Sequence, residues 1–99
     1  MIVVWTEPAA AELSEHYDYY RAHNPAAARR LRQAVINGAK RLRDYPRMGR
    51  PGRIEGTREL VIAGTPFVLV YDVAAACVEI LHVYHGRQNW QAESESDEP

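Results

Sequence analysis

Arginine is the residue type in this chain that is best suited to binding chemistry. Eleven of the twelve Lys and Arg residues are Arg, and positions 40 to 58 hold seven basic residues against two acids, Asp44 and Glu55. The seven are Lys40, Arg41, Arg43, Arg47, Arg50, Arg53 and Arg58. A guanidinium is a planar fork that binds carboxylate or phosphate through two parallel hydrogen bonds. The stretch therefore predicts a surface that binds anions.

The histidines and the cysteine do not indicate a metal site. Four His and one Cys occur at no spacing typical of zinc ligands, so we expect neither a metal nor a cofactor. The single cysteine, Cys77, cannot form an internal disulfide and fits a reducing compartment. No apolar run approaches the roughly 20 residues that cross a bilayer, and the apolar N-terminus lacks the basic region of a signal peptide. We expect a cytoplasmic protein.

The residues before the arginine-rich stretch predict a strand and two helices. Ile2 to Trp5 is β-branched and aromatic, as in a short strand. Thr6 can cap a helix that reaches about His23, and Asn24-Pro25 supplies the N-cap and first residue of a second helix. Apolar residues recur at i+3 and i+4 in both helices: Ala10, Leu13, Tyr17 and Tyr20, then Ala28, Leu31, Val35, Ala39 and Leu42. Two antiparallel helices joined by a tight turn form a helical hairpin.

The residues after it predict strands. The runs Thr57–Ile62, Phe67–Asp72 and Val78–His85 are rich in β-formers and are joined by short connections, as in an antiparallel meander. The predicted fold class is therefore α+β: an N-terminal strand, a helical hairpin, and a three-stranded antiparallel meander that completes a small sheet.

Chain length and charge predict one domain and a tail. Ninety-nine residues suit a single core, which we place at residues 1 to 92. Residues 93 to 99 hold four acids and almost no apolar surface, and we expect this acidic tail to be disordered.

Several motifs together resemble the RelE/ParE superfamily of toxins from type II toxin–antitoxin modules. They are Gly49-Arg50-Pro51-Gly52-Arg53, Glu55-Gly56-Thr57-Arg58-Glu59-Leu60-Val61-Ile62, Phe67-Val68-Leu69-Val70-Tyr71, and Val78 through Trp90. The Gly-Thr-Arg-Glu-Leu stretch and the closing pattern His85-x-x-x-x-Trp90 are most similar to the ParE-type branch. Element order and length agree over about residues 1 to 91.

The resemblance implies a plasmid-stabilisation toxin that arrests growth by inhibiting DNA gyrase, without hydrolytic chemistry of its own. It also implies neutralisation by a cognate, ParD-like antitoxin whose disordered C-terminal segment folds around the toxin in a hetero-oligomeric complex. Candidate residues for antitoxin or target binding are Arg47, Arg50, Arg53, Arg58, Arg87 and Trp90. Arg58 is equally suited to an ion pair with Glu59 or a helix carboxylate, and Trp90 to anchoring the chain end.

A RelE-like, ribosome-dependent mRNA endoribonuclease is the alternative. Metal-free RNA cleavage needs a base, an acid and cations at the phosphate, and His85, Arg87 and Arg58 are the candidate catalytic residues, with Glu55 as a second proton carrier. Two observations count against it. Val68 occupies the position where RelE-like nucleases commonly carry an Arg. In a meander, moreover, Arg58 and His85 should lie about 15–20 Å apart.

A third hypothesis is that the chain is not a toxin but a small α+β module whose basic loop binds nucleic acid nonspecifically. Its signature would be salt-sensitive binding to any duplex.

Overall fold

The computed structural model describes residues 1–86, and the fold is α+β, as predicted. The elements in order are β1 (Ile2–Trp5), α1 (Glu7–Arg21), α2 (Pro25–Arg41), β2 (Arg50–Pro51), β3 (Arg58–Val61), β4 (Phe67–Val73) and β5 (Cys77–His85). Within the described part of the chain, no helix has the length and apolar character needed to cross a membrane.

Both helices begin at the predicted caps. The Thr6 hydroxyl accepts a hydrogen bond from the Ala9 N–H at 3.4 Å, and the Asn24 amide oxygen accepts one from the Ala27 N–H at 3.1 Å. Each helix carries a proline in its first turn, where the missing N–H costs nothing. The first helix ends at Arg21 and not at His23, because the His23 and Asn24 N–H groups both donate to the Tyr20 carbonyl in the connecting turn.

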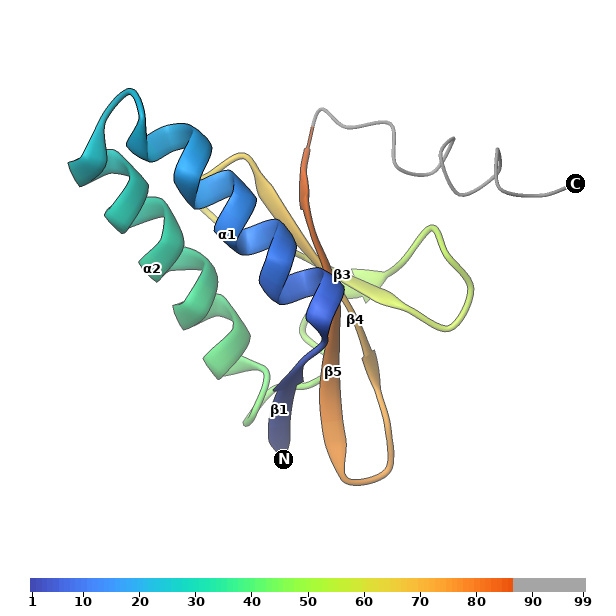
Figure 1. Cartoon of the computed structure of the whole chain (residues 1–99). Helices are drawn as coiled ribbons and strands as arrows, with labels where there is room; N and C mark the ends of the chain where they lie inside the picture. Colours follow the sequence, from blue (N-terminus) through green and yellow to red (C-terminus); the bar gives the residue numbers. More distant parts are fainter. Residues whose placement is uncertain (87–99) are drawn as a thin grey trace, which may run out of the picture.

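The strands form one five-stranded sheet in the order β1-β5-β4-β3-β2. The predicted meander is β3-β4-β5, and β1 joins it parallel to β5. The sequence did not predict β2, whose two residues pair with β3. Both helices lie on the same side of the sheet, and the turn between β2 and β3 projects away from them (Figure 1).

A bulge in β5 changes which side chains enter the core. Val70 lies opposite His82 but the next residue, Tyr71, lies opposite Ile80, so Leu81 is an extra residue in β5. The extra residue moves Val83 to the same face as Ile80, whereas an unbroken alternation would place them on opposite faces. Both are fully buried in the core under the helices.

Helix α1 closes the exposed edge of β5. Strand β1 pairs only with the first half of β5, from Cys77 to Ile80. Beyond it, the Val83 N–H donates to the Glu12 carboxylate at 3.0 Å, and His16 Nε2 lies 2.9 Å from the Val83 carbonyl oxygen. Open strand edges invite pairing with another chain, so side chains of α1 block strand addition at Val83.

Helix α2 packs closely on Ile62, the residue after β3, because Gly38 has no side chain. A Cβ at this position would lie 2.5 Å from Ile62 Cδ1. The close approach brings Val35, Ala39 and Leu42 of the helical segment into the core, each at most 2% exposed.

Tyr71 ties the connection between α2 and β2 to the sheet. The ring is fully buried, and its hydroxyl donates to the Pro46 carbonyl at 2.8 Å and accepts from the Gly49 N–H at 2.9 Å. A Cβ at Gly49 would lie 2.6 Å from the Tyr71 oxygen and 2.8 Å from the Glu59 carbonyl. Glycine is therefore required where this connection crosses the sheet.

We expect Tyr71→Phe to lower the free energy of unfolding by about 1–3 kcal/mol, because two main-chain groups lose a buried partner. Urea unfolding followed by circular dichroism measures this. Tyr45→Phe is the matched control, since Tyr45 is 65% exposed, and it should change stability by less than about 0.5 kcal/mol. Equal effects of the two substitutions would contradict the anchoring role.

The same residue predicts a dependence on alkaline pH. Burial raises the pKa of the Tyr71 hydroxyl, outweighing the opposing effects of the Gly49 N–H and of nearby Arg58. Above the unfolded-state pKa of about 10, the unfolded chain therefore loses this proton first and stability falls as pH rises. Between about pH 9 and 11, the wild type should lose more unfolding free energy than Tyr71→Phe. If the unfolding free energies of the two proteins fell in parallel over this pH range, the result would argue against a raised pKa of Tyr71.

Candidate functional site

The arginine loop, residues 47–58, is built around the carboxylate of Glu59. Arg50 lies directly opposite Glu59 in the β2–β3 pair. Its Nε and Nη2 donate to Glu59 Oε1 at 3.2 and 2.9 Å. The other carboxylate oxygen accepts the Arg53 main-chain N–H at 2.9 Å and lies 3.8 Å from Arg53 Nε. One acid thus holds two successive arginines of the loop.

The burial of Glu59 makes these contacts necessary. Its side chain is 1% exposed, and a buried carboxylate without charged or hydrogen-bonding partners is strongly unfavourable. The Arg50 and Arg53 side chains remain 54% and 47% exposed. The buried Glu59 carboxylate therefore holds both arginine side chains in place while part of each faces solvent. Both side chains are suited to bind an external anion without losing further conformational freedom.

Arg58 points to the other face of β3 and does not pair with Glu59. Adjacent strand residues alternate between faces, and Arg58 Nη1 donates to the Gly49 carbonyl at 2.7 Å and to the Arg47 carbonyl at 3.3 Å. The side chain is half-buried. Arg58 and the exposed Arg47 both line an open groove of about 260 Å³.

The structure does not bring Arg58 and His85 together. Arg58 lies opposite Tyr71 and His85 opposite Phe67, four residues apart on β4, which is about 13 Å along the strand. The His85 ring packs edge-on against Phe67, with centroids 5.9 Å apart. This offset along the strand is smaller than the predicted 15–20 Å, but β4 also lies between the two residues in the sheet.

Val68 is a core-type residue in the structure. It is 8% exposed and lies between Val61 and Tyr84 in the sheet. Glu55 is exposed at the tip of the arginine loop. Arg87, Trp90 and the acidic tail at 93–99 lie outside the described residues, so their predicted roles stay predictions.

Sequence reasoning missed the organising role of Glu59 and a contact between Glu12 and His82. Both Glu12 carboxylate oxygens lie 3.2 Å from His82 Nδ1, and the His82 ring stacks on Tyr84 at 4.7 Å. Because Glu12 also accepts the Val83 N–H, this contact belongs to the closed edge of β5. An acid within an apolar strand, close to many arginines, was the available signal for Glu59.

Comparison with known proteins gives consistent matches. A family model described as the ParE toxin of the type II toxin–antitoxin system parDE matches residues 3–90. The chain is 41% identical over 86 residues to Y4kP of Sinorhizobium fredii, covering 87% of this chain and 88% of that protein. It is 37% identical over 83 residues to toxin RelE2 of Caulobacter vibrioides, covering 84% and 92%.

A solved structure agrees. A chain from a chromosomal ParDE toxin–antitoxin system of P. aeruginosa superposes with a TM-score of 0.79 at 30% identity, covering 86% of this chain and 95% of that one. The family match lies within the predicted domain of residues 1 to 92, whose boundary stays a prediction. The chain belongs to the ParE family of toxins from type II toxin–antitoxin systems.

Proposed function

We propose that this toxin acts in the cytoplasm by binding and inhibiting DNA gyrase, as part of a plasmid-stabilisation module. The observation that carries the proposal is the separation of Arg58 from His85 across the sheet, about 13 Å along β4. Metal-free RNA cleavage needs proton carriers and cations gathered at one phosphate. The geometry of these two residues supports an inhibitor that binds its target over a nuclease.

The environments of the two residues support the same conclusion. The Arg58 guanidinium is engaged with two main-chain carbonyls, those of Arg47 and Gly49. His85 lies against the aromatic ring of Phe67. A cation already bound within the fold and a histidine against an aromatic ring are suited to structural roles.

The arginine loop is the element that we propose contacts the target. Arg50 and Arg53 are held by Glu59 and remain about half exposed, while Arg47 is exposed. A positively charged surface that is already ordered binds an acidic partner without the entropic cost of immobilising long side chains. Arg58 would support this surface by holding the Arg47 and Gly49 carbonyls.

The antitoxin is the second partner in this proposal. Antitoxins that resemble ParD would fold a disordered C-terminal segment on the toxin, as the family resemblance implies, and the complex would be hetero-oligomeric. Arg87 and Trp90 remain candidates for that contact.

A RelE-like ribonuclease is the second candidate function, favoured by one observation. Toxin RelE2 of Caulobacter vibrioides, 37% identical to this chain, carries the RelE name. In this alternative His85 and Arg87 would form the catalytic pair.

Expression without the antitoxin should stop DNA synthesis before translation and induce the DNA-damage response. Thymidine and methionine incorporation after induction measure the order of arrest, and a supercoiling assay with purified gyrase tests the target directly. His85→Ala should arrest growth as the wild type does, with His23→Ala as the control. Codon-aligned cuts in primer extension that disappear in His85→Ala would instead support the ribonuclease.

Glu59→Gln should weaken gyrase inhibition by about tenfold or more, because the neutral amide no longer holds both arginines of the loop. Its unfolding free energy should fall by about 1–3 kcal/mol, small enough for a folded toxin to be assayed. Glu55→Gln removes the same charge from the exposed tip and should inhibit like the wild type. Full inhibition by folded Glu59→Gln would exclude the arginine loop as the target contact.

A further inference from the structure

The open groove of about 260 Å³ beside the arginine loop is the feature from which a further binding site can be inferred. It is here called the Arg47–Arg58 groove. The residues that line it are Arg47, Pro51, Gly56, Thr57, Arg58 and Val73. Arg58 and Val73 lie on the face of the sheet that carries Tyr71, opposite to the face of Glu59. Strand β3 therefore separates the groove from the ion pairs of Glu59.

The fold uses only one nitrogen of the Arg58 guanidinium. Arg58 Nη1 donates to the Gly49 carbonyl at 2.7 Å and to the Arg47 carbonyl at 3.3 Å, which engages both of its protons. Among residues 1–86, Arg58 Nε and Nη2 have no hydrogen-bond partner and no carboxylate within ion-pair distance. These two nitrogens present parallel N–H groups, the arrangement that binds two oxygens of one anion.

Arg47 adds a second positive charge to the same groove. The residue is exposed, and within the described part of the chain it forms no ion pair. Arg58 binds the main chain of Arg47, so the fold holds the two like charges close together. Like charges at short distance repel each other, and an anion bound between them replaces this repulsion by two attractions.

The turn between β2 and β3 forms another part of the wall and is held in one conformation. The Gly52 N–H donates to the Thr57 carbonyl at 2.8 Å, and the Thr57 hydroxyl donates to the Ile54 carbonyl at 2.6 Å. Gly56 has a φ of +82°, a conformation that glycine adopts without strain. The groove is thus preformed, and a ligand can enter it without ordering the turn.

The charge and the lining of the groove together indicate a phosphate ligand. A terminal phosphate carries about 1.5–2 negative charges near neutral pH, which matches two guanidinium groups better than a single carboxylate does. Of the described residues that line the groove, Pro51 and Val73 are the apolar ones, and none is aromatic. This lining offers no stacking surface for a base. A ligand would be recognised through its phosphate.

We propose that the Arg47–Arg58 groove binds the phosphate of a small phosphorylated ligand, either inorganic pyrophosphate or a nucleoside diphosphate. Arg58 holds two phosphate oxygens through Nε and Nη2, and Arg47 supplies the second positive charge. The bound phosphate joins the α2–β2 connection to the β2–β3 turn, so binding stabilises the folded toxin. This site goes beyond the proposed inhibition of gyrase and does not depend on it.

Titration of the full-length toxin with pyrophosphate tests the site. The NMR signals of the Arg47 and Arg58 Nε–H groups should shift along one saturable curve. Arg50 and Arg53 are internal controls in the same loop, because they bind Glu59 on the opposite face of β3. Their Nε–H signals should shift by less than about a third as much, since charges across the strand are screened.

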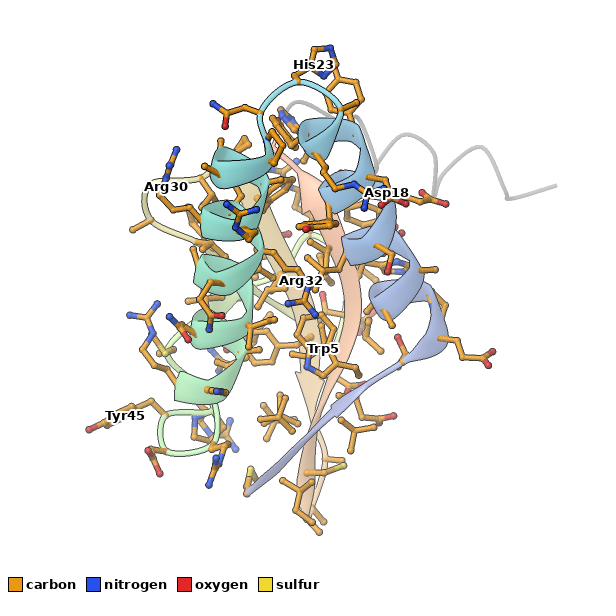
Figure 2. The ribbon with its side chains drawn as sticks, turned by 60° about the vertical axis from the view of Figure 1, so that its left-hand side comes forward. Trp5, Asp18, His23, Arg30, Arg32 and Tyr45 are labelled. Atoms are coloured by element: carbon orange, nitrogen blue, oxygen red, sulfur yellow. The ribbon has the colours of Figure 1, made fainter. Side chains whose placement is uncertain are left out.

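Three substitutions test the roles of the individual residues. Arg47→Gln should weaken pyrophosphate binding at least about tenfold, because it removes one of the two charges. Arg58→Lys keeps the charge but loses the paired N–H groups, and should weaken binding about fivefold. Arg30→Gln is the matched control and should bind within about twofold of the wild type. Arg30 is exposed and extends from the outer side of α2, away from the groove (Figure 2).

Thermal unfolding gives a second measurement on the same proteins. Pyrophosphate should raise the melting temperature of the wild type and of Arg30→Gln, and raise that of Arg47→Gln less, because a ligand stabilises only the state that binds it. Circular dichroism verifies that each variant is folded before titration.

Titration with ADP distinguishes the two sources of the phosphate. If ADP binds within about threefold of pyrophosphate, the groove recognises the diphosphate alone. If ADP binds at least about tenfold more tightly, the ligand is a nucleotide. Either result supports a phosphate site, provided that Arg47→Gln weakens the binding and Arg30→Gln does not.

Other outcomes overturn the inference. Equal weakening by Arg47→Gln and Arg30→Gln would mean that overall charge and not a site attracts the anion. Tighter binding of malonate than of pyrophosphate would assign the groove to carboxylates of a protein partner. Binding of a 20-base-pair duplex that Arg47→Gln loses, without saturable pyrophosphate binding, would assign it to a nucleic-acid backbone. The supercoiling assay, run without added phosphate compounds other than the ATP that gyrase needs, tests the proposed function separately.

Discussion

The buried carboxylate of Glu59 is the constraint on which the arrangement of the arginine loop depends. It lies on the face of β3 opposite to Arg58, so the loop is held from both sides of one strand. On one side Glu59 accepts hydrogen bonds from Arg50 and Arg53. On the other, Arg58 and Tyr71 bind the main chain from Pro46 to Gly49. A loop rich in glycine, proline and like charges is thereby given one conformation.

The positive charge of the molecule lies on two surfaces, which differ in whether a buried acid holds the basic side chains. In the arginine loop, a buried acid partly offsets the guanidinium groups and fixes their direction. On α2, the basic residues have no ion pair with an acid among residues 1–86, and the partly exposed side chains of Trp5 and Ile36 lie near them. The first surface suits a rigid contact with a folded target.

Features that depend on neighbouring residues could be predicted from the sequence. Features that depend on contacts between distant parts of the chain could not. Caps at Thr6 and Asn24 and the order of helices and strands depend on local chemistry, and these predictions were confirmed, although the first helix buries Ala9 and not the predicted Ala10. The bulge at Leu81 is not local: it arises from pairing with β4, and it moves Val83 into the core. The partners of Glu59 could not be predicted for the same reason. Arg58 is its neighbour in sequence but points to the opposite face, whereas Arg50 reaches it only because β2 pairs with β3.

The connection between α2 and β2 joins the two positive surfaces. Arg43, in the turn after α2, is four residues from Arg47, where the arginine loop begins. Both ends of this connection are fixed, since the N-terminal ammonium binds the Arg43 carbonyl and Tyr71 binds the Pro46 carbonyl. The basic residues of α2 and those of the arginine loop are therefore held in a fixed relation by hydrogen bonds of this connection to distant parts of the chain.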